Sequence, residues 1–209
     1  MKLQHKYTWL WKESGLLDEF ARDEHDNLQP LSWYVKQLPR VAKRLAAKHP
    51  MENAYANYYG WMGEVLVEFW LKKFGHRYDL QQIMDTSDQQ FNRGFDFTGA
   101  DVFDSLPVQV QVKMKSDQIR TLTKDKLFTF MDEGQKAGVL PQYLILVVPS
   151  FFGKERMEVI SYKNDFQKLA AVKFLIITGR DMQNAVNSLP SADRSGQEEF
   201  LLQFREAVQ

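Results

Sequence analysis

Gly94-Phe95-Asp96-Phe97 and Gln111-Val112-Lys113, in which the glutamine follows the acid by fifteen residues, decide the fold that this sequence predicts. Residues 95–103 and 107–115 have the composition of two strands, and 104–107 supplies the turn of a hairpin. Side chains alternate along a strand, so the second strand carries glutamines and lysines on one face and apolar residues on the other. Pairing of the two strands would bring the acid, the glutamine and the lysine to one point.

These residue types suit a site for a hard cation beside a phosphate. Asp96 offers a carboxylate, Gln111 a neutral carbonyl oxygen and Val112 a backbone carbonyl, and oxygen donors of this kind bind Mg²⁺. Lys113 would orient or activate an attacking water and balance charge on a phosphoryl transition state. The alternative interpretation is a strand face that is simply solvated.

A long helix is predicted over 52–74, and it carries two candidate acids. Glu64 and Glu68 lie four residues apart and therefore on one face. The middle of this helix is apolar nearly all round, which indicates burial, and buried carboxylates need a partner or a metal. For Glu68, an ion pair with Lys72 is an equally good interpretation.

The remaining pattern predicts an α/β sandwich around a mixed sheet. In chain order, the other predicted elements are helical sequence over 14–49 with a break near 28–30 and a kink or new start at Pro39, a strand over 77–80, a polar loop over 81–94, a helix over 122–137, strands over 143–148, 157–162 and 173–178, and a terminal helix over 196–208. We expect one compact domain, with 1–51 as a helical extension packed on 52–209.

Composition excludes several classes of function. The chain has no cysteine, so thiol catalysis and disulfides are ruled out, and its four histidines have no metal-ligand spacing. The 27 basic and 27 acidic residues cancel, so a nucleic-acid binder would need a basic face rather than a basic excess. No apolar run approaches a membrane span and no secretory signal is recognisable, so a cytoplasmic protein without membrane contact is expected.

Three motifs together resemble the PD-(D/E)XK nuclease superfamily. Residues 63–75 resemble its first helix, in which the metal-site Glu precedes the helix-ending glycine by about three turns, and Glu64 matches that offset better than Glu68. Gly94–Phe97 matches the strand that bears Asp, and Val110–Lys113 matches the variant in which Gln replaces the second acid. The resemblance covers roughly 52–148. It implies a restriction-endonuclease-like αβββαβ core, with extra N-terminal helices and C-terminal αβα elements.

The resemblance implies a metal-dependent endonuclease that hydrolyses DNA phosphodiester bonds, in restriction, phage defence or mobile-element biology. Its catalytic residues would be Glu64, Asp96, Gln111 and Lys113. Its metal ligands would be Glu64, Asp96, Gln111 and the carbonyl of Val112. Mg²⁺ is the expected ion, with Mn²⁺ able to substitute, and a homodimer is expected because a double-strand break uses two active sites. RNA is not excluded as a substrate.

Two alternatives remain open from the sequence. One is a nuclease-fold protein without catalysis that binds nucleic acid or a protein partner. The other is an interaction protein of unrelated α/β fold.

Basic and aromatic residues outside the motifs are candidates for nucleic-acid contact. The predicted phosphate contacts are Arg93, Lys115, Arg120 and Lys124, with the basic segment 36–48 as an addition. Ordinary solvated charge is the alternative for each of them. Five aromatic residues are able to stack on bases, although their helical spacing is more typical of core or interface: Trp33, Tyr34, Tyr55, Tyr58 and Tyr59.

Overall fold

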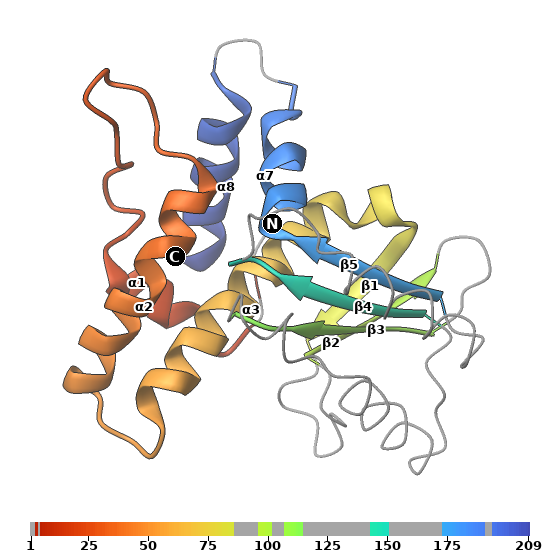
Figure 1. Cartoon of the computed structure of the whole chain (residues 1–209), viewed down its shortest axis with the longest axis horizontal. Coiled ribbons are helices and arrows are strands. Elements are labelled where there is room, and N and C mark those ends of the chain that lie inside the picture. The colour runs from red at the N-terminus through yellow and green to blue at the C-terminus, as the bar shows by residue number, and fades with distance from the viewer. Residues whose placement is uncertain are drawn as a thin grey trace, which may run out of the picture.

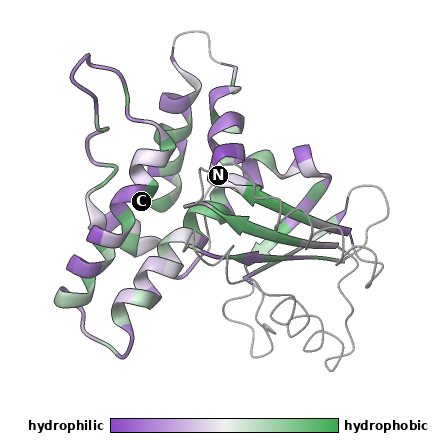
Figure 2. Ribbon diagram, in the orientation of Figure 1, coloured by the Kyte–Doolittle hydropathy of each residue, from purple (hydrophilic) through white to green (hydrophobic). Residues whose placement is uncertain are grey.

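A computed structural model describes residues 3, 5–85, 96–101, 107–114, 143–150, 173–190 and 194–209. Within these ranges the chain is an α/β protein with a five-stranded mixed sheet and five α-helices. The helices gather beside the sheet, and helix α3 (Ala54–Phe74) runs from the helical side to the strands (Figure 1). Hydrophobic residues concentrate on the strands and on the inward sides of the helices (Figure 2).

The strands lie in chain order across the sheet, β1-β2-β3-β4-β5. Their bounds are β1 Leu80–Asp85, β2 Phe97–Asp101, β3 Pro107–Val112, β4 Tyr143–Val148 and β5 Lys173–Thr178. The first three strands pair antiparallel, whereas β3 with β4 and β4 with β5 pair parallel. The predicted hairpin is confirmed, with Phe97 opposite Val110.

Strand β3 is central and buried on both faces. Val108, Val110 and Val112 form its apolar face, as the alternation predicts. On the other face Gln109 and Gln111 are each only 6% exposed. The interpretation of this face as simply solvated is therefore wrong for both glutamines, because central position in the sheet buries the strand.

Helix α3 packs closely against the end of β3 because of one glycine. Gly63 lies against Met114, and a Cβ at this position would overlap the Met114 sulfur. A residue without a side chain allows the two backbones to approach. This contact sets the distance between the helix that carries Glu64 and the strand that carries Lys113.

The other helices surround α3 and hold it in the core. They are α1 Thr8–Ser14, α2 Leu31–Lys48, α7 Gly179–Asn187 and α8 Gly196–Val208, with a 3₁₀ turn η1 at Gly75–Tyr78. The indole of Trp11 in α1 donates to Met62 O at 2.8 Å, and that of Trp70 donates to Met182 O in α7 at 3.2 Å. The N-terminal helices thus pack on the core.

Three predicted elements match their observed bounds: the strands 143–148 and 173–178 and the terminal helix 196–208. The predicted strand at 77–80 is wrong, because η1 occupies its start and β1 begins at Leu80 and extends into the predicted loop. The predicted helix over 122–137 and strand over 157–162 lie outside the described residues.

The helical prediction for 14–49 is partly wrong. Residues 15–30 form turns and extended segments, and a single helix runs through Pro39, so no new helix starts there. Val35, Leu38, Ala42 and Leu45 are all buried and continue one apolar stripe across the proline. Packing of this stripe outweighs the one hydrogen bond that proline removes.

None of the described helices combines the length and the apolar composition needed to cross a membrane.

Candidate functional site

The hairpin joins Asp96 directly to the second motif. Asp96 lies immediately before β2, and its N–H donates to Val110 O at 2.9 Å, which fixes its backbone against β3. Its Oδ2 accepts hydrogen bonds from Gln111 Nε2 at 2.8 Å and from the Val112 N–H at 2.6 Å. The convergence of Asp96 with Gln111 is therefore observed.

Helix α3 and strand β3 enclose one pocket of about 250 Å³ that contains every predicted catalytic side chain. Its lining residues are Tyr55, Ala56, Tyr59, Gly60, Glu64, Asp96, Gln111, Val112, Lys113 and Met114. Lys113 continues β3 beyond its last paired residue, and its N–H donates to Val147 O at 2.9 Å. The pocket thus joins two acids, an amide and a lysine that are distant in the sequence.

The acids of this pocket repel each other. Burial, and next the negative charge of Glu64, raise the pKa of Asp96 from its ordinary value of 3.8 to about 7. The Val112 N–H, Lys113 and His5 act in the opposite direction. Two acids in one pocket create a region of negative potential, which favours a bound cation.

The donor set fits a hard divalent ion. Gln111 is buried, and its Oε1 has no hydrogen-bond partner among the described residues, although a buried amide oxygen normally has one. With Glu64, Asp96 and the Val112 carbonyl, it completes an all-oxygen set of the kind that Mg²⁺ and Mn²⁺ prefer. No group of three His, Cys, Asp or Glu side chains able to hold a metal occurs in the described parts of the chain, so the candidate donor set depends on the Gln111 amide and a backbone carbonyl as well as on carboxylates.

Glu64, rather than Glu68, lines this pocket. Glu68 is fully buried and forms an ion pair with Lys72 one turn further along the helix. The ion-pair interpretation of Glu68 is therefore confirmed, and its carboxylate has a structural role.

His5 is a site residue that sequence reasoning missed. Its side chain is fully buried, and its Nε2 lies 3.6 Å from Glu64 Oε2. Its Nδ1 accepts a hydrogen bond from the Tyr7 N–H at 3.3 Å, so in the neutral ring the proton resides on Nε2 and points toward the acid. The Tyr7 ring stacks on the Trp61 ring of α3, with their ring centroids 3.7 Å apart, and this contact holds the N-terminal segment in place. No spacing signal identified His5, because its partner lies almost sixty residues away.

Arg93, Lys115, Arg120 and Lys124, the predicted phosphate contacts, all lie outside the described residues.

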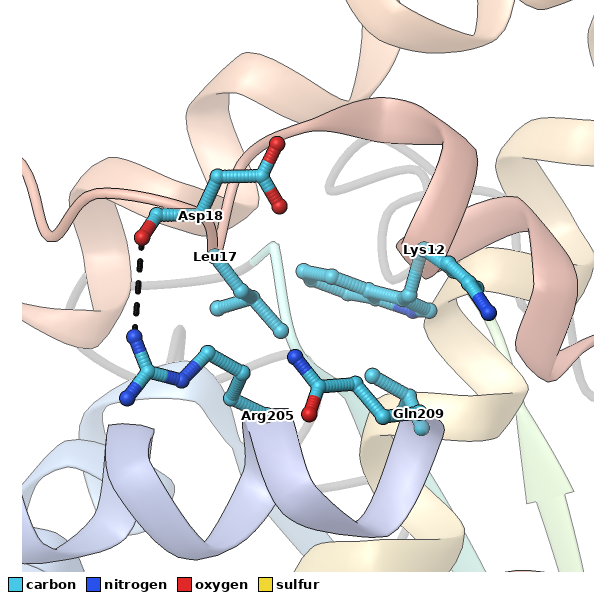
Figure 3. A pocket seen from close by; sticks show the side chains of 7 residues that line it. Lys12, Leu17, Asp18, Arg205 and Gln209 are labelled. Atoms are coloured by element: carbon cyan, nitrogen blue, oxygen red, sulfur yellow. Dashed lines mark hydrogen bonds between the residues drawn. The ribbon is translucent and has the colours of Figure 1, made fainter.

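A second pocket, of about 340 Å³, lies between α1, the turn that follows it and α8 (Figure 3). Arg205 Nη1 donates to the Asp18 backbone carbonyl at 3.5 Å across it. Its lining residues include a single acid, Asp18, beside Lys12 and Arg205, and this arrangement lacks the paired oxygen donors of the first pocket.

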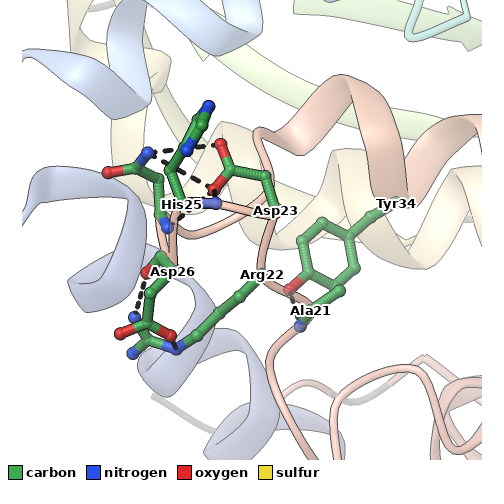
Figure 4. Close-up of polar contacts among 7 residues, drawn as sticks. Ala21, Arg22, Asp23, His25, Asp26 and Tyr34 are labelled. Carbon is green, nitrogen blue, oxygen red and sulfur yellow. Dashed lines mark hydrogen bonds and ion pairs between the residues drawn. The ribbon is translucent and has the colours of Figure 1, made fainter.

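Hydrogen bonds among its own polar groups hold the loop that precedes α2 (Figure 4). Asp23 Oδ1 accepts from the N–H groups of His25 and Asn27, both at 2.9 Å, and the Asn27 N–H is the main cause that lowers the pKa of Asp23. The Tyr34 hydroxyl accepts from the Ala21 N–H at 3.1 Å and ties the loop to α2. These contacts are structural.

Comparison with known proteins gives no match to any protein-family model and no significant match to a curated protein.

Proposed function

We propose that this protein is a metal-dependent nuclease of the PD-(D/E)XK type that hydrolyses DNA phosphodiester bonds. The observation that carries the proposal is one pocket in which Asp96 is hydrogen-bonded to Gln111, with Glu64 and Lys113 in the same lining. Sequence motifs that are separate along the chain thus meet at a single point, with the residue types that phosphoryl transfer requires.

The order of elements supports the same proposal. A helix that bears Glu64 precedes three antiparallel strands, and a strand parallel to the third follows. The described elements agree with an αβββαβ nuclease core, in which the helix expected between β3 and β4 falls outside the described residues, and β5, α7 and α8 are additions.

The proposed mechanism assigns a role to each residue. Glu64, Asp96, Gln111 and the Val112 carbonyl would hold Mg²⁺, which when bound supplies Lewis-acid stabilisation of phosphate oxygens. Lys113 orients the attacking water and balances the negative charge that develops on the phosphoryl group. A bond forms between the water oxygen and phosphorus as the water loses a proton to solvent. The bond from phosphorus to the leaving ester oxygen breaks, and that oxygen takes up a proton from solvent.

Cleavage of plasmid and oligonucleotide DNA with Mg²⁺ and with Mn²⁺ tests the proposal. We expect metal-dependent cutting by the wild type and none by Lys113→Ala, with the exposed Lys12→Ala as the matched control. Linear product formed without a nicked intermediate would support action as a homodimer. Cutting by Lys113→Ala at the wild-type rate would refute the assignment.

A second candidate function is a nuclease-fold protein that binds nucleic acid or a protein partner without cutting. The observation that favours it is Gln111 in the position of an acid, which leaves the described pocket with two carboxylates. DNA retained without any cleavage in either metal would support this function instead.

A further inference from the structure

The pocket extends beyond the candidate metal site along two rows of α3. One row consists of Tyr55, Tyr59 and Gly63, and the adjacent row consists of Ala56, Gly60 and Glu64, each with a spacing of four residues. Tyr55, Ala56, Tyr59 and Gly60 all line the same pocket as Glu64. Small residues therefore form a floor that leads to the acid, and two aromatic rings stand beside it.

The floor is open where a side chain would normally lie. Among the described residues, a Cβ at Gly60 would have only the Glu64 Oε1 within 4 Å, at 3.9 Å. From Ala56 to Glu64 the helix advances about 12 Å, at about 1.5 Å for each residue. At about 3.4 Å of rise for each nucleotide of a stacked strand, this is the length of about three nucleotides.

The two tyrosines form an ordered shelf beside this floor. Their rings are parallel within 10°, with centroids 6.2 Å apart. Tyr59 is fixed because its hydroxyl donates to Met114 O at 3.0 Å, whereas Tyr55 is 43% exposed. Tyr58, which points elsewhere from the same helix, is buried in the core.

A buried polar group at the inner end of the groove points to a ligand. Gln111 lines this pocket, is 6% exposed, and has an amide oxygen with no hydrogen-bond partner among the described residues. Within the described residues, the groove therefore combines an aromatic shelf, an open floor and a buried amide oxygen that has no hydrogen-bond partner.

We infer that this groove holds a single nucleic-acid strand, with an unpaired base about three nucleotides from the scissile phosphate stacked on Tyr55. A base in a duplex is covered on both faces by its neighbours, so only an unpaired or terminal base has a face free for the ring. The inference rests on the proposed nuclease function and names its substrate class: strands with an unpaired segment at the cut, such as forks, gaps and overhangs.

Cleavage of three substrates of one sequence tests the inference: a full duplex, a duplex with three unpaired nucleotides, and a single strand. Stacking of one base on an aromatic ring predicts a preference of roughly 5- to 100-fold for the unpaired substrates. Tyr55→Leu should reduce this preference to near unity, and Tyr55→Phe, which keeps the ring, should retain it.

A second experiment fills the floor of the groove with a side chain. Gly60→Leu places a side chain in the groove and should reduce cleavage of unpaired substrates at least tenfold, although the substitution favours the helix. Gly60→Ala adds one methyl group and should have a much smaller effect. Asn184→Leu, at an exposed residue of α7, is the control and should leave the substrate ratio unchanged.

A binding measurement separates failure of the inference from failure of the proposed function. Quenching of 2-aminopurine in the unpaired segment, measured with Ca²⁺ in place of Mg²⁺, is expected for the wild type and not for Tyr55→Leu. Cleavage of all three substrates at equal rates would overturn the groove and leave the nuclease intact. Quenching without any cleavage would support the groove and refute the nuclease, and neither signal would overturn both.

Discussion

Replacing Asp96 by Asn should stabilise the protein at neutral pH while removing its proposed metal site. The substitution keeps the size of the side chain, and the amide oxygen is able to accept the Val112 N–H bond that the carboxylate accepts now. It removes a negative charge that is buried and that faces Glu64.

The magnitude follows from the pKa of Asp96, which rises from 3.8 to about 7 on folding. Between these values the folded state keeps a proton that the unfolded state has lost, so wild-type stability falls as pH rises from about 4 to about 7. Complete ionisation above pH 7 then costs roughly 4 kcal/mol, at about 1.36 kcal/mol for each unit of pKa. Asn has no such cost, so its advantage should be near zero at pH 4 and largest at pH 8.

Urea unfolding of both proteins in EDTA, from pH 4 to pH 8, measures this difference. In thermal unfolding each kcal/mol should appear as about 2–4 °C for a domain of this size. Asp26→Asn, which removes a negative charge from an exposed loop away from the pocket, is the matched control and should not give the gain in stability expected for Asp96→Asn. Adding Mg²⁺ should stabilise the wild type more than the variant, because an ion that binds only the folded state raises its stability.

Two results would refute the reasoning. One is a variant that is less stable than the wild type at pH 8 in EDTA. The other is a stability difference that is constant from pH 4 to pH 8, which would mean that Asp96 does not lie in a buried site opposite another acid.

Other consequences of the site and its supports are testable in the same way. His5→Leu should raise the Mg²⁺ concentration for half-maximal cleavage roughly 10- to 100-fold. His5→Gln keeps an N–H donor and should restore a concentration close to that of the wild type. Equal half-maximal concentrations for the two variants would contradict a positioning role for His5. Gly63→Ala should destabilise the protein by about 1–3 kcal/mol in urea unfolding, because the added methyl group overlaps Met114, and an unchanged midpoint would contradict the close packing. Lys72→Met should cost roughly 3–5 kcal/mol, because it leaves the buried Glu68 without a partner, and a second change of Glu68→Leu should recover most of that loss.

The sequence predicted the sheet best where each strand has a strong pattern of its own. The continuous apolar run at 143–148 and the alternation around Gln111 depend only on local sequence. The first strand matches its predicted bounds, and the second begins at the predicted residue but ends at Val112, earlier than predicted. Strand β1 was missed because Leu80–Asp85 has three polar residues among six, and pairing with β2 compensates for its weak pattern.

The sequence predicted the site residues that lie near paired strands and missed the one that depends on long-range packing. Gln111 lies on β3, Lys113 directly follows that strand, and Asp96 directly precedes the neighbouring β2, so the pairing of these two strands brings them together. His5 contacts Glu64 only because the N-terminal segment packs across α3, and that path depends on long-range contacts such as the stacking of Tyr7 on Trp61. No local rule predicts such a contact.

The contact between His5 and Glu64 also bears on how this protein could evolve by gene rearrangement. A catalytic domain whose site residues all lie within its own sequence can be exchanged between genes and keep its chemistry. Here a side chain from the extension reaches an acid of the candidate site, and the Trp11 indole is bonded to the same helix. Recombination at residue 52 would therefore give a core that lacks the contact of His5 with Glu64. We expect residues 1–51 and 52–209 to be inherited as one unit.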